Sequence, residues 1–444
     1  MSQGTIYDAI VVGGGPAGAT AAHDLARKGF RVALLDREGR IKPCGGAIPP
    51  KLLREFAIGN EVLVARVRGA RIVSPRRRVV GMPIEDGYVG MVDRASFDPW
   101  LRQRACADGA DRIRGRYLRV ERNPAEEGLT LCYQDGDGEG RLRARYLIGA
   151  DGARSLVAQQ EVEGWDKGAY VFAYHEILHA PADRVCGSGA DMSKAGQSAG
   201  APPGVAQVAV APPGVAQVAI APPGLAQAGA TKDEVFYDPT RCDVYYDGRL
   251  SPDFYAWVFP HGGQLSIGTG SACKGFSQRE AIARLRAQTG LDRQQVVRRE
   301  GAPIPLKPLP RWDNGRDILL AGDAAGVVAP ASGEGIYYAM LGGRMAADAV
   351  AECLAERSPR ALARARKRFM RLHGQVFWVL GLMQKYWYAN DNRRERFVHI
   401  CADRDVQQLT WDAYMNKELV RAKPLAHVRI FFKNLAHLSG LAST

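Results

Sequence analysis

The feature that most constrains the fold is a glycine-rich turn placed between an apolar segment and a helix of small residues. Residues 6–12 read IYDAIVV and predict a buried strand, GGGPAG at 13–18 predicts the turn, and ATAAHDLARKG at 19–29 predicts a helix that stops at Gly29. RVALLD at 31–36 predicts a second strand, parallel to the first. A chain that begins with this βαβ unit belongs to the α/β class.

The glycines of this turn have the spacing that binds a dinucleotide. Gly13, Gly15 and Gly18 form GxGxxG, which permits a tight turn, close approach of the backbone to a pyrophosphate, and packing of the helix on the strand. Asp36 ends the second strand, where it can accept hydrogen bonds from a ribose hydroxyl, and it disfavours a 2′-phosphate and therefore NADPH at this site. A glycine turn without a ligand is the alternative, but the strand, helix and acid in register argue against it.

A second turn with glycine and aspartate lies far along the chain. ILLAGDAAG predicts a buried strand that brings Gly322 and Asp323 to a turn, where the carboxylate can meet a ribityl hydroxyl. Gly333, Gly335 and Ile336 then open a helix whose free amides can stabilise negative charge on a reduced flavin. A helix cap is the alternative for AGDAAG alone, but the two turns together indicate FAD.

These motifs resemble those of known flavoproteins. GGGPAG with Asp36, LIGADGARS at 147–155 and AGDAAG at 321–326 are similar to the three fingerprints of the p-hydroxybenzoate hydroxylase fold. The geranylgeranyl reductases of chlorophyll and bacteriochlorophyll synthesis are a narrower match, through KPCGGAIP at 42–49, YVGMVDR at 88–94, YAWVFPHG at 255–262 and PASGEGIYYAM at 330–340. The resemblance covers nearly the whole chain except residues 186–232.

The resemblance implies an α/β fold: an FAD-binding Rossmann-like domain of the glutathione-reductase type, a β-rich substrate domain and a helical C-terminus. The expected ranges are FAD-binding parts at 1–75, 96–160 and 306–360, substrate-lobe strands at 76–95, the substrate domain at 161–305 and the helical region at 361–444. Residues 201–230 hold three near-copies of a ten-residue unit that begins APPG. We expect a flexible extended insertion over 186–232, with a partner-binding arm as the alternative.

The resemblance also implies a reaction. FAD would take a hydride from NADPH and saturate isolated double bonds of a geranylgeranyl group, either as the free diphosphate or esterified to bacteriochlorophyll or chlorophyll, to give phytyl. An unconjugated alkene accepts hydride poorly, so it needs a proton at its less substituted carbon and stabilisation of the tertiary cationic character left beside it. An FAD-dependent aromatic monooxygenase and a non-enzymatic prenyl-binding escort are the alternatives.

We expect Cys44, Tyr255 and Trp257 to act at the alkene. Cys44 lies in IKPCGGAIPP, where prolines and paired glycines shape a loop, and it is either a proton donor or a small packing residue. Tyr255, Trp257 and Phe259 alternate along a strand and share one face, which either lines a prenyl channel or packs between the two lobes. His261 follows at a turn, and we expect it to be exposed.

The motifs and the resemblance together predict one set of cofactor contacts. Arg94 resembles a family arginine near the flavin phosphates, with a salt bridge as the alternative; Asp151 and Gly152 resemble a pyrophosphate contact, with a plain turn as the alternative. The full set is Gly13, Gly15, Ala17, Gly18, Asp36, Arg37, Cys44, Gly45, Arg94, Asp151, Gly152, Gly322, Asp323, Gly333, Gly335 and Ile336. The sequence has no second GxGxxG for NADPH, so it does not identify the residues that bind NADPH, and we expect no metal site.

Composition narrows the expected setting of the protein. A formal charge of +13 and a pI near 9.4 favour contact with phosphates or acidic surfaces, but no nucleic-acid-binding module accompanies them. Eight cysteines without a CxxC pair, and an N-terminus without a secretory signal, indicate reducing cytoplasm. Aromatic and basic residues beyond about 360 predict helices that either attach to the surface of the photosynthetic membrane or pack on the protein's own core.

Overall fold

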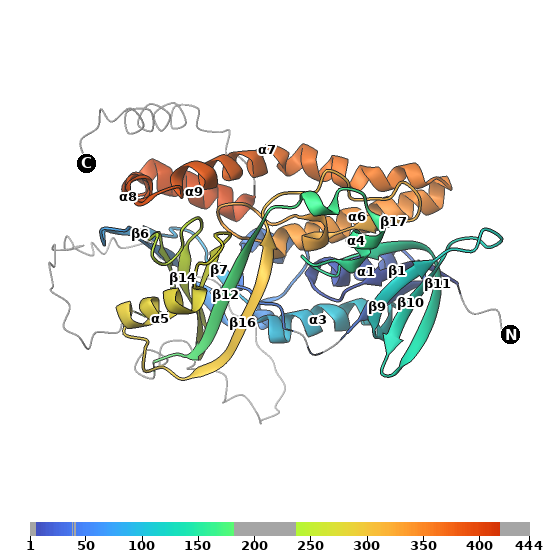
Figure 1. Cartoon of the computed structure of the whole chain (residues 1–444), viewed down its shortest axis with the longest axis horizontal. Coiled ribbons are helices and arrows are strands. Elements are labelled where there is room, and N and C mark those ends of the chain that lie inside the picture. The colour runs from blue at the N-terminus through green and yellow to red at the C-terminus, as the bar shows by residue number, and fades with distance from the viewer. Residues whose placement is uncertain (1–5, 38, 40, 182–236, 418–444) are drawn as a thin grey trace, which may run out of the picture.

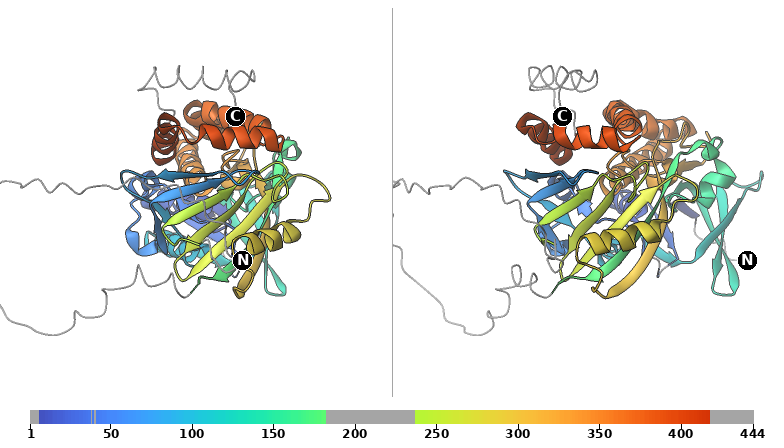
Figure 2. Two further views of the ribbon diagram at one scale, coloured as in Figure 1. Left: turned by 90° about the vertical axis from the view of Figure 1, so that its left-hand side faces the viewer. Right: turned by 60° about the vertical axis from the view of Figure 1, so that its left-hand side comes forward.

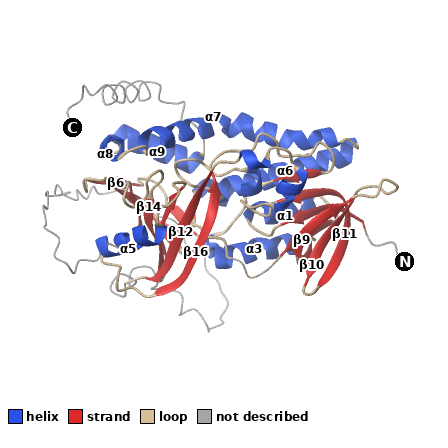
Figure 3. Ribbon diagram, in the orientation of Figure 1, coloured by secondary structure: helices blue, strands red, loops and turns tan. Residues whose placement is uncertain are grey.

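The structure is a computed structural model that describes residues 6–37, 39, 41–181 and 237–417. Two β-sheets lie side by side, and the longest helices gather over one side of them (Figure 1; Figure 3). The insertion predicted at 186–232 lies outside the described residues.

The first sheet contains the predicted βαβ unit. β1 (Ile6–Val12) lies between β2 (Val32–Asp36) and β11 (Gly138–Gly149), and both pairings are parallel. The order of the sheet is β8 (Asp111–Arg114), β2, β1, β11, β10 (Leu129–Asp135) and β9 (Arg116–Glu121), with β17 (Ile318–Leu320) also paired to β11 in parallel. The central strands are buried apolar runs because helices cover the sheet.

Helices α1 (Pro16–Arg27) and α6 (Ile336–Glu356) pack closely because the residues at their contact are small. A Cβ atom added at Gly343 would lie only 2.1 Å from the carbonyl oxygen of Ala17. α3 (Arg94–Ala107) packs against the same helix α1, while the short helices α2 (Pro50–Glu55) and α4 (Leu156–Glu161) complete this lobe. The close approach brings the start of α6 to the glycine-rich turn.

The second sheet builds the β-rich lobe. Its order is β16 (Val296–Pro305), β12 (Tyr170–His179), β15 (Gln264–Ser271), β14 (Ala256–His261), β13 (Arg241–Tyr245), β5 (Gly69–Val73) and β6 (Val79–Pro83). All pairings are antiparallel except β13 with β5, and α5 (Gln278–Gln288) packs on β12 and β15. β5 falls within residues 1–75, which we expected to form an FAD-binding part, yet it pairs in this sheet; the domain boundaries stay predictions.

A small third sheet and a helical layer join the two lobes. The small sheet has the order β3 (Ala47–Ile48), β7 (Val89–Met91) and β4 (Ala65–Val67). The helical layer contains α7 (Ala363–Trp387), α8 (Asp391–Ile400) and α9 (Arg404–Asn416), which Figure 2 shows on one side of the sheets in orange and red. Within the described ranges, none of the helices has both the length and the apolar character that crossing a membrane requires.

Short 3₁₀ turns connect these elements. They span Asn60–Val62, Trp165–Lys167, Gly322–Ala325 and Pro359–Leu362. The turn at Gly322–Ala325 follows β17 directly, so it carries the second glycine and aspartate motif to the same edge of the first sheet as the first motif.

Candidate active site

A cavity of about 420 Å³ lies between the two lobes and under the helical layer. One part of its lining comes from the predicted cofactor motifs: Gly15, Pro16, Ala17, Lys42, Arg94, Gly152, Asp323, Gly333, Gly335 and Ile336. The other part is apolar and aromatic: Val67, Val89, Val244, Tyr246, Tyr255, Trp257, Phe259, Leu380, Met383, Tyr388, Trp411 and Tyr414. The cavity therefore has a side formed by the cofactor motifs and an apolar, aromatic side.

The three glycines of GxGxxG are present for different reasons. Gly13 has φ +103°, and a Cβ there would lie 2.4 Å from the carbonyl oxygen of Ala150; a Cβ at Gly18 would lie 1.8 Å from the carbonyl oxygen of Gly13. At Gly15, among the described residues other than its chain neighbours, only Arg94 Nη2 lies within 4 Å of an added Cβ, at 3.7 Å. Gly13 and Gly18 are required by the protein's own packing, whereas Gly15 leaves room in the cavity.

The three predicted corners meet around this turn. Gly13 packs on Ala150 of the LIGADG segment, and a Cβ at Gly322 would lie 2.6 Å from the Cβ of Ala17. Gly322 has φ +64°, which a side chain would strain. Segments far apart in the sequence therefore converge on one edge of the first sheet, as the sequence predicts.

Carboxylates at this edge already have cationic neighbours. Asp36 accepts a hydrogen bond from the Gly14 amide at 3.2 Å and lies 3.4 Å from Arg102 Nη1. Asp323 is buried and pairs with Lys42, which also lines the cavity. Arg37 follows β2 and is exposed. Asp323 lines the cavity, whereas Asp36 and Arg37 are not among its lining residues, and the predicted ribose and ribityl contacts stay predictions.

Arg94 both lines the cavity and forms a buried salt bridge. Its Nε and Nη2 donate to the two carboxylate oxygens of Asp98 at 2.5 and 2.7 Å. Burial lowers the pKa of Arg94, but the Asp98 carboxylate more than offsets this, so the pKa is raised and the guanidinium stays charged. The salt bridge that the sequence left as an alternative role for Arg94 is therefore present, and it holds the positive charge of Arg94 beside Gly15.

Asp151 and Gly152 face different ways. The Asp151 carboxylate accepts hydrogen bonds from the Ser155 hydroxyl and from the Leu156 amide, the latter at 2.7 Å, at the start of α4. Burial raises the pKa of Asp151, which these hydrogen bonds oppose. Gly152 has φ +89° and lines the cavity, which Asp151 does not. The turn thus offers its backbone to the cavity and uses its carboxylate to hold α4.

The glycines of the loop that contains Cys44 (residues 41–50, the cysteine loop) let it pack tightly against the segment after β7 and against the second sheet. Gly46 has φ +79°, and a Cβ there would lie 2.4 Å from the Val92 carbonyl oxygen. A Cβ at Gly45 would lie 3.0 Å from the ring of Phe259. Cys44 borders the cavity, and its Sγ accepts a hydrogen bond from the Gly46 amide at 3.4 Å.

The expectation that His261 is exposed is wrong. Its side chain is buried, because the residue ends β14 in a pairing with Gln264 and the cysteine loop covers it. A Cβ at Gly46 would lie 2.9 Å from His261 Nε2. Burial lowers the pKa of His261 to about 4, so the imidazole is neutral at neutral pH and supports the loop.

Tyr255, Trp257 and Phe259 form an aromatic wall, as the alternation predicts. Successive ring centroids are 5.9 and 6.2 Å apart, and all three residues line the cavity. The Trp257 indole donates to Ser266 Oγ at 3.1 Å, and the Tyr255 hydroxyl donates to the Ser332 carbonyl at 2.5 Å. Their polar ends are thereby satisfied, and their faces remain for contact with an apolar ligand.

Sequence reasoning missed the residues that the helical layer contributes. Trp411 and Tyr414 on α9 and Leu380 and Met383 on α7 line the cavity. Each pair has helical spacing of three residues, which was the available signal, although such a pair usually marks a packed core. Glu334, within PASGEGIYYAM, also lines the cavity and was not singled out.

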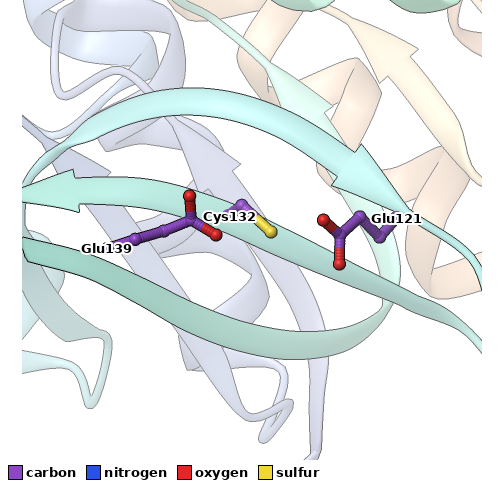
Figure 4. A group of neighbouring side chains, drawn as sticks. All are labelled: Glu121, Cys132 and Glu139. Carbon is purple, nitrogen blue, oxygen red and sulfur yellow. The ribbon is translucent and has the colours of Figure 1, made fainter.

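A second cluster of potential ligand atoms lies away from the cavity, on β9, β10 and β11. Glu121, Cys132 and Glu139 have ligand atoms within 4.8 Å of one another (Figure 4). Arg119 donates to both carboxylates, at 2.7 to 3.0 Å. Burial raises the pKa of the Cys132 thiol to about 11, so it keeps its proton. The Arg119 guanidinium already neutralises the negative charge of the Glu121 and Glu139 carboxylates, which a metal ion would need.

Comparisons with known proteins agree with this arrangement. One family model, described as pyridine nucleotide-disulphide oxidoreductase, matches residues 7–182, and another, described as lycopene cyclase protein, matches residues 276–433. A geranylgeranyl diphosphate reductase of Rhodobacter capsulatus is 50% identical over 98% of both chains. A geranylgeranyl diphosphate reductase of Synechocystis is 32% identical over 96% of this chain and 97% of the relative.

Solved structures share the fold. A geranylgeranyl bacteriochlorophyll reductase-like protein from Thermoplasma acidophilum has a TM-score of 0.70 at 20% identity, covering 95% of this chain and 99% of the other. The p-nitrophenol 4-monooxygenase of Pseudomonas putida has a TM-score of 0.63 at 16% identity, covering 94% and 99%. The predicted fold class, with its FAD-binding Rossmann-like domain, is confirmed.

Proposed function

The chain belongs to the geranylgeranyl diphosphate reductase family, and from this premise we propose that it is an NADPH-dependent flavoprotein that reduces a geranylgeranyl group to phytyl. One observation carries the proposal: the dinucleotide corners and the aromatic wall line the same cavity. An enzyme that hydrogenates an isolated alkene needs both a redox cofactor and a dry pocket for the hydrocarbon, side by side.

The residues present fit FAD. Gly15 leaves open space above the start of α1, Arg94 holds a positive charge beside it, and Gly335 places the start of α6 at the cavity. Helix N-termini and a buried guanidinium stabilise phosphate and other negative charge. Bound FAD would supply the hydride for the reaction. We assign Gly15, Arg94 and Gly335 as cofactor contacts on this basis, and the other residues of the predicted set stay predictions.

The chain's own residues hold the prenyl group and shield it from water. Tyr255 and Trp257 present aromatic faces that stabilise cationic character on the alkene, and the residues of α7 and α9 close the apolar side of the cavity. Cys44 borders the same space, either as a proton donor or as a packing residue.

NADPH is the reductant that we propose, on the strength of the family likeness. The free diphosphate and the pigment ester are both candidate forms of the substrate. A substrate with a C20 tail resides in or near a lipid bilayer, so we propose peripheral attachment of this basic protein to the photosynthetic membrane.

The test is anaerobic incubation of the purified yellow protein with NADPH and each prenyl donor, followed by mass measurement of the tail. We expect gains of two, four or six hydrogens, which also report how many double bonds are reduced. In a parallel aerobic incubation, consumption of oxygen with a gain of one oxygen atom on the substrate would instead indicate a monooxygenase. Protein that binds the prenyl donor but contains no flavin would indicate an escort.

A further inference from the structure

Glu334 carries a buried oxygen without a partner at the edge of the cavity. Its Oε2 pairs with Lys417 Nζ, just beyond the end of α9, while Oε1 is buried and accepts no hydrogen bond from the residues that the structure describes. The side chains of Glu334 and Lys417 are only 8% and 3% exposed. Glu334 lines the cavity and Lys417 does not. A buried carboxyl oxygen without a partner is costly, so it needs a physical explanation.

The loop that presents Glu334 is held in an unusual conformation. Ala331 has φ +61°, which a residue with a side chain adopts only where its surroundings enforce it. The Ala331 amide donates to Gln384 Oε1 at 3.3 Å, and the Tyr388 hydroxyl donates to the Ala331 carbonyl at 3.0 Å. A Cβ at Gly333 would lie 3.0 Å from the ring of Phe254. The position of Glu334 is therefore enforced by α7, by Tyr388 and by Phe254.

We propose that Glu334 is the general acid that protonates the prenyl double bond and that Lys417 positions it, an inference that rests on the proposed function. The O–H bond of the Glu334 carboxyl breaks, and its proton bonds to the less substituted alkene carbon through the π electron pair. A hydride from a reductant of the dihydroflavin class, which is thereby oxidised, forms the second C–H bond at the tertiary carbon. Glu334 is left as a carboxylate beside the Lys417 ammonium and regains a proton from water.

The acid strengths of the groups around the cavity favour Glu334. Burial raises the pKa of Tyr255 and of Tyr414, so these phenols hold their protons even more tightly than usual. Burial also raises the pKa of Glu334, with Lys417 opposing, so its carboxyl is more often protonated than an exposed one, and a carboxyl is ordinarily a stronger acid than a phenol. An alkene without conjugation requires the strongest acid available.

The surroundings of the pair define its pH response. Burial lowers the pKa of Lys417, and Glu334 opposes this. The other titratable groups that face the pair are Tyr255 before β14, Tyr338 on α6, Tyr414 on α9 and, acting on Lys417, Lys51 on α2. Lys417 is the cation that pairs directly with Glu334 and opposes the effect of burial, so its removal raises the pKa of Glu334 further.

The test compares prenyl reduction and flavin reduction in holoenzyme variants. Glu334→Gln keeps the shape and removes the acid, so we expect prenyl reduction to fall by about 100-fold or more while NADPH still bleaches the flavin. Glu334→Asp should recover part of the rate. The rate of prenyl reduction should fall at high pH as Glu334 loses its proton. Lys417→Met should shift this fall to a higher pH, because it raises the pKa of Glu334. Damage to packing alone would instead lower the rate equally at every pH. The exposed Glu163→Gln is the matched control.

A spectroscopic readout accompanies the rates. In the oxidised holoenzyme with the prenyl diphosphate bound, infrared difference spectra should contain a protonated carboxyl band that Glu334→Gln removes. If Glu334→Gln alone unfolds because Lys417 is left unpaired, the double variant Glu334→Gln with Lys417→Met removes both charges and should show the same loss of prenyl reduction. Wild-type prenyl rates in either variant, or no carboxyl band assigned to Glu334, would overturn the proposal. A wild-type enzyme that never reduces the prenyl group would refute the proposed function instead.

Discussion

Replacing Gly15 with leucine should remove the flavin and leave the fold. Gly15 precedes α1 with φ −78° and ψ −175°, an extended conformation that any residue adopts, and an added Cβ meets only Arg94 Nη2 at 3.7 Å. The expected cost to the apoprotein is that of a poorer residue at a helix N-cap, about 1 kcal/mol. The leucine side chain, however, would fill the space above the turn where we propose that the pyrophosphate binds.

The assay measures flavin absorbance per chain and the free energy of unfolding with and without added FAD. At a free FAD concentration of about 100 times Kd, the wild type should gain about 2.7 kcal/mol, and the Gly15→Leu variant should gain nothing. Gly263→Leu is the matched control, because its Cβ would meet no heavy atom of the described residues within 4 Å and Gly263 lies outside the cavity.

Gly13→Ala provides the contrast. At φ +103°, with its Cβ 2.4 Å from the Ala150 carbonyl oxygen, this change should cost the apoprotein about 1–3 kcal/mol from backbone strain alone, in addition to weakening flavin binding. A Gly15→Leu protein that retains one flavin per chain would refute the placement of the pyrophosphate over this turn.

Three further predictions concern the cysteine loop. Cys44→Ala should slow prenyl reduction while NADPH-dependent bleaching of the flavin continues, and unchanged prenyl turnover in stopped-flow assays would assign Cys44 to packing. Gly46→Ala should lower the free energy of urea unfolding by about 2 kcal/mol, because the residue has φ +79° and its Cβ would lie 2.4 Å from the Val92 carbonyl. The pKa of His261 falls from 6.5 to about 4 on folding, because burial disfavours the charged imidazole. The contribution of His261 to the free energy of unfolding is therefore complete above the unfolded pKa and is lost as the pH falls toward 4. The expected loss between pH 7 and pH 5 is about 2 kcal/mol. His261→Leu should remove this part of the acid sensitivity, and an identical pH dependence in both proteins would contradict it.

Local patterns predicted the elements that hold the cofactor motifs. The apolar run at 6–12 and the apolar start of ILLAGDAAG at 318–326 indicated buried strands, and these are β1 and β17. The alternation of Tyr255, Trp257 and Phe259 indicated one strand face, and all three line the cavity. Such predictions succeed because strand and turn geometry depend on neighbouring residues.

Features that depend on distant partners were not predictable in the same way. His261 follows a proline and precedes two glycines, which indicates an exposed turn, but the cysteine loop buries it. Glu334 and Lys417 are 83 residues apart, and no periodic pattern relates them. The aromatic residues of α9 reach the cavity only because the helical layer folds back over both lobes.

The glycine-rich turn shows what the sequence determined and what only the tertiary structure decided. The sequence by itself determined that strand, turn and helix form a dinucleotide-binding unit, since the spacing of Gly13, Gly15 and Gly18 obeys local steric rules. Only the tertiary structure decided that Gly13 packs against Ala150 while Gly15 leaves space beside Arg94, because distant segments supply those atoms. The tertiary structure likewise decided the apolar side of the cavity, because its residues come from strands and helices that meet only in the folded chain.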